Sequence, residues 1–132
     1  MIFRRDTNKV FSEKKILFVL QRHFGIKPGN LSLYKNALIH KSYIDPNSKG
    51  HVATNERLEF LGDAFLGSTV AEFLYNKYPD ADEGFLSKLR AKIISRKHLN
   101  MLAYKLGVSQ LVYNNISGGV IGNNSIAGNA LE

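Results

Sequence analysis

Residues 54–78 carry the longest patterned stretch of the chain and predict one long helix. Asn55 stands at the cap position, Glu56 lies in the first turn, where the helix dipole favours an acid, and Pro79 ends the run. Apolar residues point in nearly every direction around this helix: Leu58, Phe60, Leu61, Ala64, Phe65, Leu66, Val70, Ala71, Phe73 and Leu74. Because a helix that is apolar all round is normally buried, we expect this one to lie in the core.

Shorter apolar repeats predict further helices on both sides of the long one. Gly25 should end a helix over residues 13–24, and Asp80 or Asp82 should cap a helix that reaches about Arg96. The remaining expected elements are a helix from the turn at 27–30 to about His40, a helix over 98–106 closed by Gly107, a short extended piece at 111–113, and loops at 44–53 and 114–124. This order of elements predicts an all-α fold.

Three acids share one face of the long helix. Glu56, Glu59 and Asp63 are spaced i, i+3 and i+7, which brings Glu59 and Asp63 to roughly 6 Å from each other. The same stripe of this helix carries no cation to neutralise them. Two carboxylates this close in apolar surroundings must share a bound cation or take up a proton. The alternative is an exposed face on which all three acids are solvated.

Length and composition limit the possible classes. A chain of 132 residues predicts one domain with one core, and the absence of cysteine excludes a disulfide framework and a Cys-based zinc site. The longest apolar run, residues 16–20, is too short to span a bilayer, and the basic tail at about 1–11 lacks the apolar centre of a signal peptide. We therefore expect a soluble, cytoplasmic protein.

Charge is distributed unevenly around a formal net charge of +7. Residues 1–53 hold ten Lys or Arg and three Asp or Glu, and residues 84–131 hold six basic residues and no acid. Residues 54–83 between them hold two basic and seven acidic residues. Basic segments around an acidic centre suit a polyanion that rests on the cations while a metal ion bridges the acids. A basic protein with solvated lysines is the alternative that composition alone leaves open.

The acidic helix also carries a family resemblance. Residues 55–64, Asn-Glu-Arg-Leu-Glu-Phe-Leu-Gly-Asp-Ala, resemble the signature segment of the ribonuclease III family. The resemblance implies an all-α endonuclease domain that forms a symmetric homodimer and hydrolyses double-stranded RNA with Mg²⁺, or with Mn²⁺. The expected products carry a 5′-phosphate, a 3′-hydroxyl and a short 3′ overhang, and the expected role is RNA processing, ribosomal RNA included.

Three further segments are similar to this family. Residues 37–43, Ala-Leu-Ile-His-Lys-Ser-Tyr, match it except for Ile39, where the family has Thr, and residues 80–90 match the segment after the signature helix. Residues 125–132 match the start of the last major helix, with Asn129 in place of the family's Asp. The resemblance implies that Glu59, Asn129 and Glu132 hold the metal, while Asp63 and Glu132 orient the attacking water.

Further contacts are expected at residues whose ordinary explanation stays open. His40 and Lys41, with the cations that follow the signature helix, are candidates for RNA contact, although cations on a helix are usually a solvated face and a single His is more often structural. These cations are Lys88, Arg90, Lys92, Arg96 and Lys97. Glu56 and Glu83 are supporting acids by resemblance, while a first-turn acid such as Glu83 also stabilises its own helix. Phe60 is expected to cross to the partner subunit, or to pack within its own.

Asn129 leaves two functions open. An amide oxygen can bind Mg²⁺, but the site loses one formal negative charge, so weaker metal binding is expected. The alternative function is a catalytically impaired dimer that binds RNA or associates with the ribosome. Residues 1–132 also lack the family's hydrophobic continuation of the last helix and its double-stranded-RNA-binding domain, so the expected organisation is a single catalytic domain with a truncated final helix.

Overall fold

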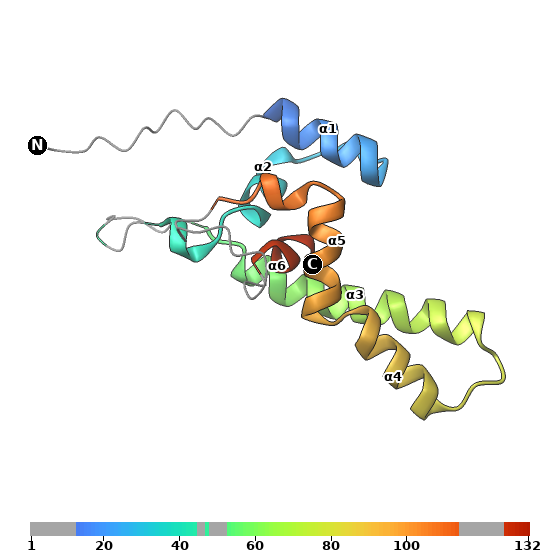
Figure 1. The fold of residues 1–132 in the computed structure, drawn as a ribbon. Helices are drawn as coiled ribbons and strands as arrows, with labels where there is room; N and C mark the ends of the chain where they lie inside the picture. Colours follow the sequence, from blue (N-terminus) through green and yellow to red (C-terminus); the bar gives the residue numbers. More distant parts are fainter. Residues whose placement is uncertain (1–12, 45–46, 48–52, 114–125) are drawn as a thin grey trace, which may run out of the picture.

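The computed structural model describes residues 13–44, 47, 53–113 and 126–132, and this part of the chain is helical apart from turns and one isolated bridge. Figure 1 shows the helices in chain order: α1 (Glu13–Phe24), α2 (Leu31–Ala37), α3 (Glu56–Lys77), α4 (Glu83–Ile93), α5 (Arg96–Lys105) and α6 (Ile126–Leu131). Short 3₁₀ turns cover Lys41–Tyr43 and Val108–Gln110. The all-α expectation is confirmed.

Side-chain caps fix where three of the helices begin. Asn30 accepts the Ser32 amide at 3.1 Å, Asp82 accepts the Phe85 amide at 2.7 Å, and Ser95 accepts the His98 amide at 3.3 Å. Each cap satisfies an amide that has no partner within the first turn of its helix. Of the two candidate caps for the helix after Pro79, the structure selects Asp82.

The core forms where α1, α5 and α6 meet the segment after α2. Its buried members are Ile16, Leu38, Ala103, Val108, Leu111 and Ala127. Helix α6 packs on α5, whereas α3 and α4 run together away from the other helices (Figure 1). An edge-to-face contact between Tyr78 and Phe85, with ring centroids 5.4 Å apart, joins α3 to α4 across their connection. The beginning of α3 lies near α6 and so beside the core (Figure 1).

The expectation that the long helix is buried is wrong for the single chain. Within α3 only Leu74 is fully buried, at 2% exposure, while Phe60 is 81% exposed and Phe65 is 67% exposed. Helix α3 contacts α2 on one side and α4 on another, and these neighbours do not surround it. An apolar surface of this kind on a monomer marks an interaction site.

Several predicted boundaries also differ from the structure. Helix α2 ends at Ala37, before the expected limit at His40, because the chain pairs with Tyr113 instead: the Tyr113 amide donates to Leu38 and the His40 amide donates to Tyr113. The helix expected to reach Arg96 ends at Ile93, since Ser95 caps a new helix. On α1, Ile16 is buried, whereas Leu17 and Phe24 are exposed.

Some predicted features lie outside the described residues. These are the basic tail at about 1–11, most of the loop at 44–53 and the loop at 114–124. Within the described residues, no helix combines the length and the apolar character needed to cross a bilayer.

Candidate active site

Helix α3 presents the expected acids in two different settings. Glu59 is half-buried, and Asp63, one turn further along α3, is exposed. Glu56 is exposed and forms an ion pair with Lys41, with 3.1 Å between the lysine Nζ and the glutamate Oε1. The stripe of acids on α3 itself carries no cation. Lys41 reaches Glu56 from the turn that precedes α3, a contact that the spacing of residues along one helix could not indicate. Glu56 is thus neutralised, and Glu59 and Asp63 remain together.

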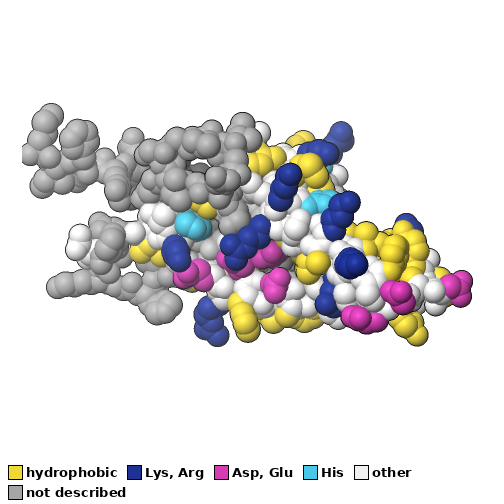
Figure 2. All heavy atoms as spheres, turned by 60° about the horizontal axis from the view of Figure 1, so that its bottom comes forward, with side chains coloured by type: hydrophobic (Ala, Val, Ile, Leu, Met, Phe, Trp, Pro, Cys, Tyr) yellow, Lys and Arg dark blue, Asp and Glu magenta, His cyan; other side chains and the backbone are white. Residues whose placement is uncertain are grey.

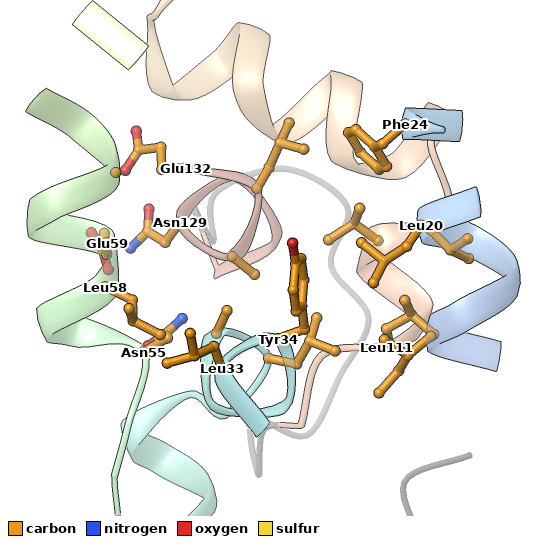
Figure 3. A pocket seen from close by; sticks show the side chains of 18 of the residues that line it. Leu20, Phe24, Leu33, Tyr34, Asn55, Leu58, Glu59, Leu111, Asn129 and Glu132 are labelled. Carbon is orange, nitrogen blue, oxygen red and sulfur yellow. The ribbon is translucent and has the colours of Figure 1, made fainter. Parts of the chain in front are cut away.

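Helix α6 brings Glu132 to these two acids. Figure 3 shows Glu132 and Asn129 pointing across the space between α6 and α3, toward the side of α3 that carries Glu59. Burial raises the pKa of the half-buried Glu132 carboxyl, and the negative charges of Asp63 and Glu59 raise it further. Arg96 opposes this shift without cancelling it. Acids from two segments that are far apart in the sequence therefore lie near one another.

The acids meet at the surface and not in a closed interior. Glu59 and Glu132 are half-buried, and Asp63 is exposed. Figure 2 shows Asp and Glu side chains beside Lys, Arg and His side chains on one face of the molecule. In the described part of the chain, no three Asp, Glu or His side chains lie close enough together to hold a metal ion as they stand.

The donor set nevertheless fits a hard divalent cation. Asn129 lies with Glu59 and Glu132 in the wall of one cavity, so carboxylate and amide oxygens from α3 and α6 face a common space (Figure 3). Mg²⁺ prefers oxygen ligands and usually keeps several waters, which allows a site with few protein ligands. Glu132, whose pKa is raised by burial and then by neighbouring carboxylates, would gain the most from such a cation.

His40 has a structural role that the sequence left open. Its Nδ1 accepts the Ser42 amide at 3.2 Å, which caps the turn Lys41–Tyr43, and it lies 2.8 Å from the Ser42 hydroxyl. Because Nδ1 accepts a backbone N–H, the proton of the neutral ring is on Nε2. Burial, followed by Lys41, lowers the pKa of His40, against the opposing effect of Glu56 and Glu59. His40 therefore stands beside the α3 acids as a neutral ring.

Glu83 is not brought to the other acids. It begins α4 and accepts a hydrogen bond from the Ser87 hydroxyl at 2.6 Å. It lines an open cleft with Glu72 and Arg90, beside the half of α3 remote from Glu59. Within one chain, the first-turn explanation of Glu83 accounts for what the structure shows.

The predicted RNA-binding cations are all exposed, and they occupy different surroundings. Lys88, Arg90 and Lys92 lie on α4, and Arg96 and Lys97 begin α5. Arg96 is close enough to Glu132 to influence its pKa, whereas Arg90 lines the cleft that holds Glu83. Arg96 thus lies at the border between the basic residues and the acids, a position that helical spacing alone did not indicate.

An apolar cavity of about 440 Å³ adjoins the acids. Asn55 lies in its wall and is 1% exposed, and neither polar atom of its side chain has a hydrogen-bond partner among the described residues. The expected side-chain cap by Asn55 is therefore wrong: the residue precedes α3, but it makes no capping bond. Its buried amide is costly without a partner, and the sequence offered no signal for this environment.

The Ribonuclease-III-like family matches residues 30–132, which include both segments that carry the acids. The chain belongs to this family. Ribonuclease 3 of Azobacteroides pseudotrichonymphae is 44% identical over 135 residues, and Ribonuclease 3 of Zunongwangia profunda is 45% identical over 113 residues. These alignments cover 99% and 86% of this chain but only 51% and 46% of the two relatives.

Solved structures of ribonuclease III nuclease domains are similar to this chain. The nuclease domain of ribonuclease III from Campylobacter jejuni matches with a TM-score of 0.73 and 31% identity, over 87% of this chain and 78% of that chain. The study of that domain describes structural flexibility in a region involved in dimer formation. A second structure of the same domain gives a TM-score of 0.71.

The pKa of Glu132 leads to a prediction for the metal-free protein. Because this pKa is raised above 4.5, Glu132 stabilises the fold while it is protonated, and this contribution is lost as the pH rises through the raised value. We expect the wild-type melting temperature in EDTA to fall, relative to that of Glu132→Gln, as the pH rises above 4.5. Thermal denaturation of both proteins between about pH 4 and about pH 7 measures this difference. Parallel curves would contradict the prediction.

Proposed function

We propose that this chain is the catalytic domain of a divalent-metal-dependent endoribonuclease that hydrolyses double-stranded RNA. One observation carries the proposal: Glu132, directly after α6, shares a cavity wall with Glu59 of α3, and its pKa is raised by burial and then by the charges of Asp63 and Glu59. Acids held together against their mutual repulsion are typical of a functional site. Membership of the ribonuclease III family supports the substrate class. The proposed role of this nuclease is RNA processing in the cytoplasm, including that of ribosomal RNA.

The side chains divide the work of hydrolysis. Glu59, Asn129 and Glu132 would hold Mg²⁺ or Mn²⁺, which makes water a stronger nucleophile and offsets the charge that builds up on the phosphate. Asp63, with Glu132, would accept hydrogen bonds from the attacking water and orient it. The water oxygen bonds to phosphorus as the bond to the 3′ oxygen breaks, which leaves a 5′-phosphate and a 3′-hydroxyl.

The exposed cations would hold the RNA by its backbone. Lys88, Lys92 and Lys97 have no acidic partner within salt-bridge distance among the described residues, and Arg96 stands next to Glu132. Contacts to phosphate position a duplex without reading its bases. Because A-form RNA hides its base edges in a deep groove, we expect recognition of shape with little sequence preference.

A symmetric homodimer would cover the exposed side of α3. Phe60 is 81% exposed, and its neighbours Leu61 and Phe65 are exposed as well. Burying such a patch against a second copy removes apolar area from water twice, once for each subunit. Two sites related by the dimer axis would then each cut one strand of the duplex.

The function is tested by incubating the protein with long duplex RNA, with and without Mg²⁺, and analysing the product ends. We expect metal-dependent cleavage to fragments with a 5′-phosphate and a short 3′ overhang. Binding without cleavage under every metal condition would refute the nuclease. It would favour the catalytically impaired RNA-binding dimer that the amide at residue 129 allows.

Asn129→Asp should tighten metal binding. The added charge is worth about 1 kcal/mol at 4 Å in water and more in a partly buried site, so we expect roughly a tenfold lower Kd for Mg²⁺. In EDTA the same variant should melt at a lower temperature, because a fourth carboxylate joins the cluster. Titration calorimetry measures the first effect and thermal denaturation the second. Unchanged affinity would place residue 129 outside the ligands.

A further inference from the structure

Helix α6 (Ile126–Leu131) carries Asn129, and Glu132 directly follows it. Since helices in proteins are stabilised mainly by packing, the contacts of α6 with its neighbours decide where these two residues stand. Two such contacts, one with α3 and one with α5, touch the backbone of α6 and the residue that follows it.

The contact with α3 depends on Gly62. A Cβ at this position would lie 2.1 Å from the carbonyl oxygen of Glu132 and 2.5 Å from its carbonyl carbon. No side chain fits at those distances, so the backbone of Glu132 rests directly on α3. Gly62 stands between Glu59 and Asp63 in sequence, and the contact therefore brings Glu132 to the height on α3 at which the two acids project.

The contact with α5 depends on Asn100. Its side-chain Oδ1 accepts the Gly128 amide at 3.2 Å, and this amide lies in the first turn of α6, where it has no partner within the helix. A Cβ on Gly128 would lie 3.0 Å from the backbone nitrogen of Asn100, so the backbones of α6 and α5 are close here. Arg96, four residues before Asn100 on α5, is the cation that opposes the raised pKa of Glu132.

We propose that Gly62 and Asn100 are positioning residues of the acidic cluster: they hold α6 between α3 and α5 and so set where Asn129 and Glu132 stand relative to Glu59 and Asp63. The proposal rests on the proposed function for its metal, but the geometry it claims exists without metal. Neither residue touches the substrate or the ion, and both act through the backbone of α6.

Two matched pairs of variants test this. Gly62→Ala is paired with Gly67→Ala, a glycine on the same helix whose Cβ would meet nothing within 4 Å. Asn100→Leu removes the acceptor for the Gly128 amide, and Asn100→Asp keeps it. We expect Gly62→Ala and Asn100→Leu to weaken Mn²⁺ binding at least tenfold by calorimetry, while Gly67→Ala and Asn100→Asp stay within about threefold, consistent with the effect of residues that orient metal ligands.

A second readout is independent of metal. In EDTA, the backbone amide NMR signals of Asn129 and Glu132 should move in Gly62→Ala and Asn100→Leu and stay near their wild-type positions in the two control variants. Should Gly62→Ala fail to fold, the Asn100 pair decides the question. Wild-type Mn²⁺ affinity in Gly62→Ala or Asn100→Leu, or unmoved amide signals in either, would overturn the proposal. Failure of the wild type to bind Mn²⁺ would instead refute the nuclease, and the amide signals would still decide the positioning role.

Discussion

Glu132→Gln is expected to reduce cleavage of duplex RNA by roughly 10³-fold or more, a loss on the scale of removing a key electrostatic group from an active site. Glu132 is the residue that both proposed roles share, since it would hold the metal and orient the water. The amide keeps the size of the side chain but removes the negative charge that would bind the metal and orient the water. Single-turnover cleavage at saturating protein measures the loss.

RNA binding should separate this effect from a folding defect. Glu132→Gln removes one negative charge, so we expect its affinity for duplex RNA to be equal to or slightly higher than that of the wild type. Glu72→Gln is the control, because Glu72 is an exposed acid on α3 that lines the other cleft. Normal cleavage by Glu132→Gln, or an equal loss in Glu72→Gln, would show that the roles are assigned wrongly.

Phe60→Ala is expected to convert the dimer to monomers at micromolar concentration. Burying one Phe side chain is worth about 1.5–3 kcal/mol, and a symmetric interface buries two copies. The variant should therefore raise the dimer Kd by roughly 10²- to 10⁴-fold. Analytical ultracentrifugation over a concentration series measures this shift.

A second exposed phenylalanine provides the control for Phe60. Phe18 on α1 is 64% exposed, so Phe18→Ala removes a similar apolar area from a different surface. It should leave the dimer Kd unchanged. If Phe60→Ala remains as dimeric as the wild type, Phe60 does not cross to a partner subunit. The exposed side of α3 would then need another explanation.

Local patterns predicted much of the helical framework. Spacing of apolar residues, together with capping and stop residues, located the long helix to within two residues of α3 at its start and one at its end. The prediction from local patterns failed where a residue contacts another that is distant in the sequence. Helix α2 ends early because the residues that follow it pair with Tyr113, and Asn55 is buried in a cavity wall and makes no side-chain cap to α3.

The acids of the site were also found from spacing, but their environments were not. Helical periodicity placed Glu59 and Asp63 together, and the family resemblance added Glu132. Neither of them could show that Lys41 pairs with Glu56, that Arg96 lies near Glu132, or that Glu83 lines a different cleft. Each of these facts depends on how two elements pack, which a pattern along one helix does not contain.

The sequence by itself determined the class of the protein: an all-α chain, two acids one turn apart, and a signature that places it in the ribonuclease III family. These features can be recognised from residues that lie near one another in the chain. Only the tertiary structure decided which acids meet and which side of α3 stays uncovered. The backbone of Glu132 rests on Gly62, and the Gly128 amide donates to the Asn100 side chain; such contacts exist only after the helices have packed.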